Sequence, residues 1–132
     1  MKKTIFIIPG YGHTANDRWH KWMAPFFKSK GFIVKEVSIQ WMYRVMSDYV
    51  EQFQDFYLKN KGEKNYILGF SFGAMIAFLS APTLKPNKLF LCSLSPYFKE
   101  DLKNIDDASR KFFGVRQLKD LENHSATKTV GY

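Results

Sequence analysis

The stretch YILGFSFGAMIAF, residues 66–78, places the tightest constraint on the fold of this 132-residue chain. An apolar run ending at Leu68 predicts a buried strand, and the small and apolar residues over 73–81 predict a helix. Gly69 and Gly73 bracket the turn between the two elements, and a glycine has no Cβ atom to collide where a strand and a helix pass close together. A strand that turns directly into a helix is typical of an α/β fold with a parallel sheet.

The rest of the chain alternates between strand-like and helix-like pieces. Short apolar runs predict strands over residues 4–10, 65–70 and 87–95, and an alternation of apolar and polar residues predicts one over 32–40. Helical spacing of apolar side chains predicts helices over residues 16–31, 47–62, 73–81, 99–113 and 114–124. The length fits a single domain over residues 1–132, with residues 125–132 as an irregular tail. We therefore expect a three-layer α/β/α fold around a parallel sheet of about four strands.

Capping residues and prolines refine these helices. Asn16 or Asp17 is expected to cap the first helix and Ser47 the second, because short polar side chains accept hydrogen bonds from the first free N–H groups. Pro25 is expected to kink or split the first helix, and Pro82 to end the third, since proline lacks the N–H that a helix interior needs.

The net charge of +8 comes from 20 lysines and arginines against 12 aspartates and glutamates, scattered along the chain. This pattern predicts a solvated, lysine-rich surface; attraction to an anionic partner such as nucleic acid, a membrane surface or an acyl carrier is the alternative. The sequence has no compact basic block and no nucleic-acid-binding motif, so we expect no nucleic-acid partner.

The N-terminal apolar run, Ile5–Ile8, is too short for the core of a signal peptide or for a membrane span. The single cysteine, Cys92, has no partner for a disulfide within the chain, which fits a reducing compartment. We therefore expect a cytoplasmic protein without a membrane span.

Ser71 stands at the centre of the turn and completes the pattern G-x-S-x-G. A serine at such a strand-to-helix turn adopts strained backbone angles, and the turn lifts its hydroxyl above the end of the sheet. The N-terminus of the following helix stabilises negative charge that develops there. We predict that Ser71 is a nucleophile; a plain glycine-flanked turn is the alternative.

The loop Pro9–Gly12, after the first predicted strand, fits the second half of a site that stabilises an oxyanion. Its glycines, Gly10 and Gly12, let the backbone approach a substrate oxygen closely. We assign the oxyanion donors to the backbone N–H groups of Phe72 and Tyr11, with that of Gly12 as a near alternative. The loop could instead cradle a phosphate, but it lacks the G-x-G-x-x-G and G-x-x-x-x-G-K patterns, so we expect no nucleotide, metal or other cofactor.

The order of these pieces, with PGYGH after the first strand and GFSFG after the third, resembles the N-terminal part of the α/β-hydrolase superfamily over about residues 4–96. The segment DRWHKWM is similar to compact serine hydrolases related to retinoblastoma-binding protein nine. The resemblance implies an incomplete hydrolase fold with a parallel sheet in the order 2-1-3-4. It also implies that Ser71 lies at the carboxyl end of the third strand, where open α/β sheets bind ligands.

A serine nucleophile needs a base, and the base needs an acid that orients it. In this superfamily the chain order is serine, acid, histidine. His124 is the only histidine after Ser71 and is the candidate base, although its polar surroundings also fit a surface histidine. Asp101 is the candidate acid, because a variant of the superfamily carries its acid after the fourth strand; a solvated helix face is the alternative. The other candidate acids are Asp106, Asp107 and Asp120.

Two histidines precede Ser71. His13 lies in the glycine loop, where it could face the site as a base or simply shape the pocket. His20 falls in the first predicted helix and is expected on the helix surface.

The simplest interpretation of the missing acid and base is a chain that lacks the C-terminal strands of the hydrolase fold, as a truncated product or part of a longer protein. The apolar strand predicted over 87–95 would then be an unpaired sheet edge. An edge of this kind favours self-association or a partner.

Aromatic and apolar side chains near the predicted strand ends indicate a pocket for an acyl or aryl group, with ordinary core packing as the alternative. Phe70 and Trp41 are candidate substrate contacts; the others are Met42, Tyr43, Phe72, Tyr97 and Phe98. The sequence favours a serine hydrolase that acts on a small-molecule carboxylic ester, thioester or amide through an acyl-enzyme. A catalytically incomplete chain that serves only as a binding or interaction module is the alternative.

Overall fold

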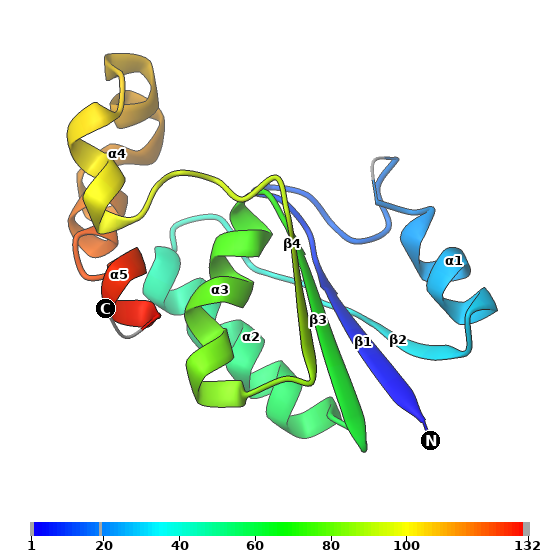
Figure 1. The fold of residues 1–132 in the computed structure, drawn as a ribbon. Coiled ribbons are helices and arrows are strands. Elements are labelled where there is room, and N and C mark those ends of the chain that lie inside the picture. The colour runs from blue at the N-terminus through cyan, green and yellow to red at the C-terminus, as the bar shows by residue number, and fades with distance from the viewer. Residues whose placement is uncertain (1, 19, 131–132) are drawn as a thin grey trace.

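The computed structural model describes residues 2–18 and 20–130. Within them, four parallel strands form one sheet in the order β2-β1-β3-β4 (Figure 1). The strands are β1 (Lys3–Ile8), β2 (Phe32–Glu36), β3 (Lys64–Phe70) and β4 (Lys88–Cys92). The α/β class and the strand order 2-1-3-4 expected from the sequence are confirmed. β4 pairs only with β3 and is therefore one edge of this sheet.

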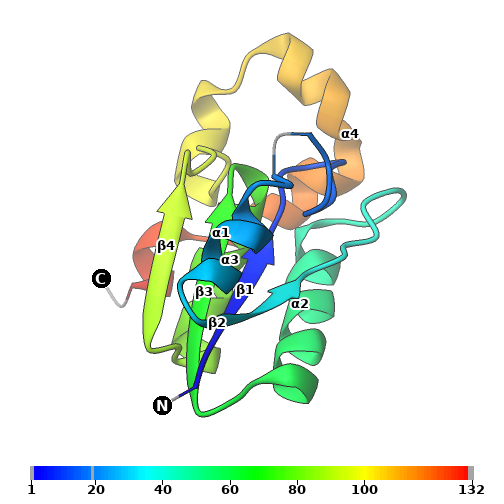
Figure 2. The same cartoon turned by 90° about the vertical axis from the view of Figure 1, so that its right-hand side faces the viewer.

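Helices cover both faces of the sheet (Figure 2). One face carries α1 (Met23–Ser29), and the other carries α2 (Met46–Asn60) and α3 (Phe72–Leu84). After β4 the chain forms a 3-10 helix, η1 (Lys99–Asn104), followed by α4 (Asp107–Leu121) and α5 (Ala126–Thr129). Both views place α4 beyond the carboxyl ends of the strands. None of the helices in the described residues is long and apolar enough to cross a membrane.

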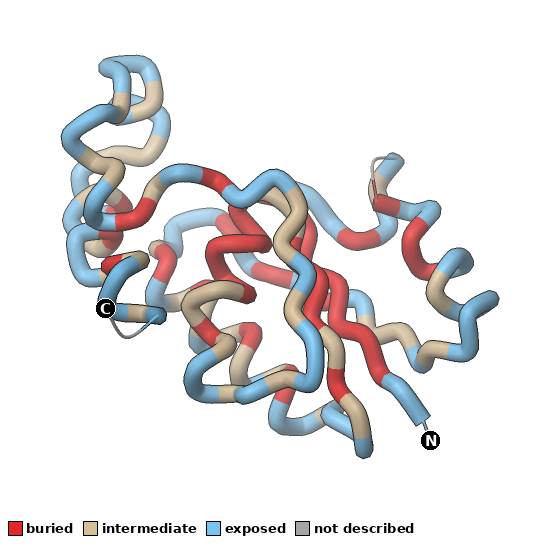
Figure 3. The backbone as a smooth tube through the Cα atoms, in the orientation of Figure 1, coloured by how far each residue is buried: buried red, intermediate tan, exposed pale blue. Residues whose placement is uncertain are grey.

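Burial is highest in the central strands and in the first turns of α3 (Figure 3). The residues Ile5–Ile8 of β1 are wholly buried, and they alternate between two apolar clusters. Ile5 and Ile7 join the cluster on the α1 side, whereas Phe6 and Ile8 join the larger cluster with α2 and α3. A parallel strand between two helix layers has no solvent face, which is why this segment is apolar throughout.

The first helix is much shorter than predicted. α1 begins only at Met23, and the described residues between 15 and 22 form turns. Pro25 lies in the first turn of α1, where its missing N–H costs little, so it neither kinks nor splits the helix. As a consequence His20 is not on a helix surface, as we expected, but is buried, with 2% of its surface exposed.

Other boundaries also differ from those predicted. Pro82 lies inside α3 instead of ending it, and β4 ends at Cys92. The two charged helices predicted after β4 form η1 and a single α4, which is kinked at Gly114, φ 76°. The segment 125–132, expected to be irregular, contains the one-turn helix α5; residues 131 and 132 lie outside the described residues.

Side chains of α4 cover the N-terminus of α2. The side-chain oxygen of Gln117 accepts a hydrogen bond from the Met46 N–H at 2.9 Å, and Asp120 accepts one from the Ser47 N–H at 2.8 Å. These contacts satisfy N–H groups that have no partner within the helix. Ser47 is therefore not the cap that the sequence predicted: Val45 occupies the N-cap position.

We expect Gly69→Ala to destabilise the fold by about 4 kcal/mol or more, the range of a severe core defect. A Cβ atom at Gly69 would overlap backbone atoms of Gly73 and Ala74 in α3, which cannot rotate away. Gly31→Ala is the matched control, because Gly31 has φ +87° but open space around its Cβ position, so only backbone strain of about 1–3 kcal/mol is expected. Urea unfolding measures the stability of both variants. Equal losses of stability in Gly69→Ala and Gly31→Ala would contradict the steric argument.

Glu100 ties η1 to α5. Its carboxylate accepts hydrogen bonds from the hydroxyl of Ser125, from the Ala126 N–H at 2.9 Å and from the hydroxyl of Thr127. These donors, Ser125 foremost, hold the pKa of Glu100 below its ordinary value of 4.5. A carboxyl group with a lower pKa in the folded state stabilises the fold above its unfolded pKa and loses this effect as the pH falls.

We therefore expect the wild-type chain to lose more stability than Glu100→Gln when the pH is lowered from about 5 to about 2. The urea midpoint measured as a function of pH checks this. Parallel curves for the two proteins would show that the contacts of Glu100 contribute nothing to folding.

Candidate active site

Ser71 joins the last residue of β3, Phe70, to the first residue of α3, Phe72. Its backbone angles are φ 57° and ψ −116°, a region that a residue with a side chain adopts only under strain of about 1–3 kcal/mol. Close packing enforces this turn, because a Cβ atom at Gly73 would overlap the carbonyl oxygens of Pro9 and Ile8 at the end of β1. The steric function predicted for the two flanking glycines is confirmed.

Ser71 lines two cavities. Its Oγ atom is 3.0 Å from Oγ of Ser95, the residue that follows β4 after a short bend. The aromatic cavity, of about 320 Å³, is lined by Tyr11, Ser71, Phe72, Ser95, Tyr97, Asp106, Ala108, Ser109, Phe112 and Phe113. The histidine cavity, of about 370 Å³, is lined by Gly10, Tyr11, His13, His20, Phe70 and Ser71. Ser71 is thus reachable from two sides.

The glycine loop lies directly beside Ser71. A methyl group on Gly10 would lie 3.5 Å from Cβ of Ser71 and 3.8 Å from Cδ2 of His13. The ring of Tyr11 packs edge-on against that of Phe72, with centroids 5.5 Å apart. The Phe72 N–H is the first of α3 and, like the first N–H groups of any helix, has no intrahelical partner. The backbone N–H groups of Tyr11 and Phe72, predicted to donate to an oxyanion, therefore belong to two neighbouring segments, the glycine loop and the start of α3.

The two residues predicted to act as acid and base lie elsewhere. Asp101 caps η1, where its carboxylate accepts a hydrogen bond from the Phe98 N–H at 3.1 Å. His124 lies with Ser47 and Asp120 at the contact between α2 and α4. Neither Asp101 nor His124 lines the two cavities that Ser71 borders.

The cluster of Ser47, Asp120 and His124 contains the three residue types of a catalytic triad but not its geometry. Nε2 of His124 lies 3.0 Å from the Ser47 hydroxyl and 3.2 Å from the Asp120 carboxylate. In a triad the serine and the acid meet opposite nitrogens of the imidazole, so that the acid orients the nitrogen that takes the proton. Both partners meet one nitrogen here, and the cluster serves to hold α4 against α2.

The two candidate substrate contacts differ in position. Phe70 lines the histidine cavity, and its contact with a substrate stays a prediction. Trp41 is buried behind Tyr11, with ring centroids 5.3 Å apart, and its indole N–H donates to the backbone carbonyl of His13 at 3.1 Å. It is absent from the lining of both cavities that Ser71 borders. Trp41 thus positions the glycine loop.

Sequence reasoning missed the group formed by His13, Asp17 and His20. One carboxylate oxygen of Asp17 lies 2.6 Å from Nδ1 of His13, and the other lies 2.7 Å from Nδ1 of His20. The sequence signal of this group is the spacing H-x-x-x-D-x-x-H. The local pattern favoured a helix cap at Asn16 or Asp17 and a helix-surface position for His20 instead. No set of three His, Cys, Asp or Glu side chains suited to a metal ion occurs among residues 2–18 and 20–130.

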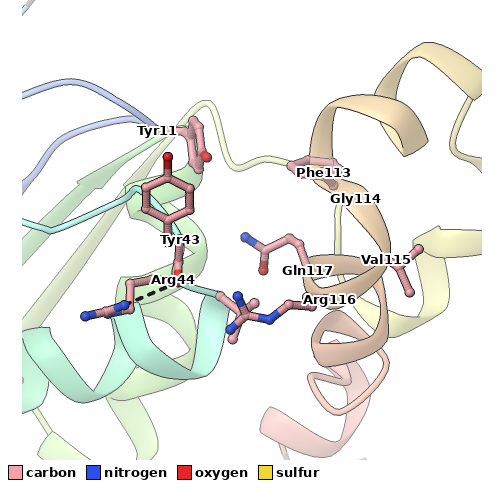
Figure 4. Close-up of a pocket in the computed structure, with 9 residues that line it drawn as sticks. Tyr11, Tyr43, Arg44, Phe113, Gly114, Val115, Arg116 and Gln117 are labelled. Atoms are coloured by element: carbon pink, nitrogen blue, oxygen red, sulfur yellow. Dashed lines mark hydrogen bonds between the residues drawn. The ribbon is translucent and has the colours of Figure 1, made fainter.

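A third cavity, of about 320 Å³, lies between the loop 43–45 and α4 (Figure 4). Tyr11 and Tyr43 line one side of it, and Arg116 and Gln117 line the other. Tyr49 anchors this loop, because its hydroxyl lies 2.7 Å from the Trp41 carbonyl and 2.9 Å from the Arg44 carbonyl. Burial raises the pKa of Tyr49, which therefore stays a neutral donor.

No protein-family model matches the chain, and no curated protein matches its sequence. Solved structures do match it. Alpha/beta hydrolase domain-containing protein 10 from mouse is similar over 92% of this chain and 61% of its own, with a TM-score of 0.67 and 14% identity. The chain has the core of the α/β-hydrolase fold.

Two further hydrolases share this core. The α/β hydrolase MGS-MChE2, from a metagenome of lagoon sediments at Mar Chica, Morocco, is similar over 100% of this chain and 64% of its own, with a TM-score of 0.65 and 18% identity. A carboxyl esterase from Bacillus coagulans is similar over 93% of this chain and 47% of its own, with a TM-score of 0.58 and 19% identity. The chain thus spans less than two thirds of each of the three proteins, and at these identities the similarity shows the fold.

We expect Asp120→Ala to lower the free energy of unfolding by about 1–3 kcal/mol, because the N–H and hydroxyl of Ser47 lose their acceptor at the N-terminus of α2. Glu122→Ala is the matched control: Glu122 is an exposed acid at the end of the same helix, and its loss is expected to change stability by no more than about 0.5 kcal/mol. Thermal unfolding of both variants checks this. If they are equally stable, α4 is not held by this contact.

Proposed function

We propose that the chain is a serine hydrolase that cleaves a carboxylic ester, thioester or amide through an acyl-enzyme on Ser71. The observation that carries the proposal is the strained backbone of Ser71 at the carboxyl end of β3, with the side chain on the wall of two cavities. Strained residues persist only where the surrounding structure holds them, and they cluster at active sites. The fold shared with three hydrolases is consistent with this reaction class.

In the proposed reaction the Ser71 oxygen attacks the substrate carbonyl carbon. The backbone N–H groups of Phe72 and Tyr11 donate to the oxygen that becomes negative, with Gly12 as the near alternative to Tyr11. Gly10 lets the loop approach that oxygen closely. The N-terminus of α3 adds a favourable electrostatic potential at the same point.

The aromatic cavity suits the acyl or aryl part of a small-molecule substrate. Its walls include the rings of Phe72, Tyr97, Phe112 and Phe113, and these rings pack against one another. Because one of the proteins with the same fold is a carboxyl esterase, an ester is the first substrate class to test. A narrower relation to the compact hydrolases similar to retinoblastoma-binding protein nine rests only on the segment 17–23.

A binding or interaction module is the second candidate. The positions of Asp101 and His124, away from Ser71, favour it, because the predicted base then does not reach Ser71, although Asp106, another candidate acid, lines the aromatic cavity. Self-association through β4 would fit such a module. β4 is a sheet edge, and its Phe90 is 41% exposed.

We expect a fluorophosphonate to label the wild-type chain at Ser71 and to leave Ser71→Ala unlabelled, since the reagent needs an activated serine oxygen. Ser29→Ala, at an exposed serine of α1, is the matched control and should be labelled like the wild type. Mass spectrometry of the peptide that contains Ser71 measures the adduct. If the wild type is labelled no more than Ser71→Ala while it binds a small ester without turnover, the binding module is the better description.

A further inference from the structure

Asp17 is held between two histidines in the loop that precedes α1. Its first carboxylate oxygen accepts hydrogen bonds from the backbone N–H of His20 at 3.1 Å and from the ring of His20 at 2.7 Å. Its second oxygen lies 2.6 Å from Nδ1 of His13. The carboxylate is therefore fixed on one side by His20 and orients His13 on the other.

These contacts define the protonation pattern of both rings. A carboxylate only accepts hydrogen bonds, so the hydrogen atoms lie on Nδ1 of His13 and on Nδ1 of His20. In the neutral rings Nε2 then carries a lone pair and can accept a proton. Nε2 of His20 is buried without a hydrogen-bond partner among the described residues, whereas the side chain of His13 is 47% exposed.

His13 and Ser71 face the same cavity. Both line the histidine cavity, and Gly10 separates them with no side chain of its own: a methyl group there would touch Cβ of Ser71 and Cδ2 of His13. Cδ2 is bonded to Nε2 in the ring, so the nitrogen that can accept a proton lies on the edge of the ring nearer to this space. The other titratable side chains that contact His13 in the described residues are Asp17 and His20.

We propose that His13 is the base that takes the proton of Ser71, and that Asp17, locked by His20, is the positioning residue that orients it. The inference rests on the proposed function and deepens it, since His124, the base predicted from the sequence, does not line either cavity beside Ser71. A triad depends on geometry and not on chain order, so the order histidine, acid, serine is no obstacle.

The proton and electron balance is that of an acyl transfer. The Ser71 oxygen forms a bond to the carbonyl carbon while its proton moves to Nε2 of His13, and the carbonyl electron pair moves onto the oxyanion. The leaving group departs with the proton from Nε2, which leaves the acyl-enzyme. Water then attacks the acyl carbon and gives its proton to Nε2, which returns this proton to the Ser71 oxygen when the acid is released.

One local movement is needed. The Ser71 hydroxyl is hydrogen-bonded to Ser95 in this structure and must rotate about χ1 to turn toward His13. Such rotations are fast, and hydrogen bonds in a catalytic site without substrate are often long or misaligned. His20 has a separate function: its buried ring packs edge-on against Phe70, with centroids 5.1 Å apart, and this contact fixes Asp17 relative to β3.

The first test is the pH dependence of fluorophosphonate labelling in the 132-residue chain. We expect the labelling rate of the wild type to rise with the deprotonation of one group. In His13→Gln we expect the rate to fall by about 100- to 10,000-fold and this dependence to be lost. Added imidazole should restore labelling in His13→Ala, which a purely structural loss would not allow. Asn16→Ala, at an exposed residue of the same loop, is the matched control and should label like the wild type.

The second test addresses Asp17 without depending on activity. Nitrogen-15 NMR of the wild type should show the hydrogen of His13 on Nδ1. In Asp17→Asn the amide NH₂ can donate to Nδ1, so the hydrogen should move to Nε2, where the ring can no longer accept the proton of Ser71. Labelling should then fall by a similar factor while thermal unfolding remains cooperative.

The outcomes separate the two proposals. If the wild type is labelled at Ser71 and His13→Gln is labelled equally fast, His13 is not the base, although Ser71 remains the nucleophile. If imidazole does not restore labelling in His13→Ala, the loss is structural and the inference is wrong. If the wild type is labelled no more than Ser71→Ala, the proposed function itself fails, and the inference fails with it.

Discussion

The contact between the start of α3 and the end of β1 is the constraint on which the rest of the molecule depends. Gly73 lies so close to the carbonyl oxygens of Pro9 and Ile8 that no side chain fits between them. This contact brings the loop after β1 beside the turn after β3, because both strands end at the same edge of the sheet. The strained angles of Ser71 follow from it, as does the proximity of Tyr11 and Phe72.

The same contact explains which parts of the fold could be predicted from the sequence. Strands buried on both faces are apolar throughout, and the glycines at the junction have a local steric cause, so β1, β3 and the start of α3 were recognisable from a few residues. The expected position of Ser71 needed no information about distant contacts. By contrast, Asn16 and Asp17 fit a helix cap equally well on local grounds. Asp17 binds His13 and His20 instead, and the chain turns there without forming a helix.

The C-terminal part of the described chain shows why residue types alone are a poor guide to a site. His124 and Asp120 suggested a base and an acid, but Ser47 and Asp120 both approach the same imidazole nitrogen of His124, and Asp120 also accepts hydrogen bonds directly from Ser47. Asp120 acts with Gln117 as a side-chain cap for α2, a function that depends on contacts about seventy residues apart in the sequence. This cap in turn holds α4 in place, and α4 supplies Phe112 and Phe113 to the aromatic cavity.

A base in the glycine loop would couple two functions that hydrolases of this fold usually separate. Tyr11 and His13 belong to one short turn, in which the His13 N–H donates to the Gly10 carbonyl at 3.0 Å and Trp41 donates to the His13 carbonyl. Any movement of this turn would shift the proposed oxyanion donor and the proposed base together, relative to a nucleophile that is fixed by the sheet. The buried Trp41 then acts on both through one hydrogen bond, and the active geometry depends on how rigidly the core holds that indole ring.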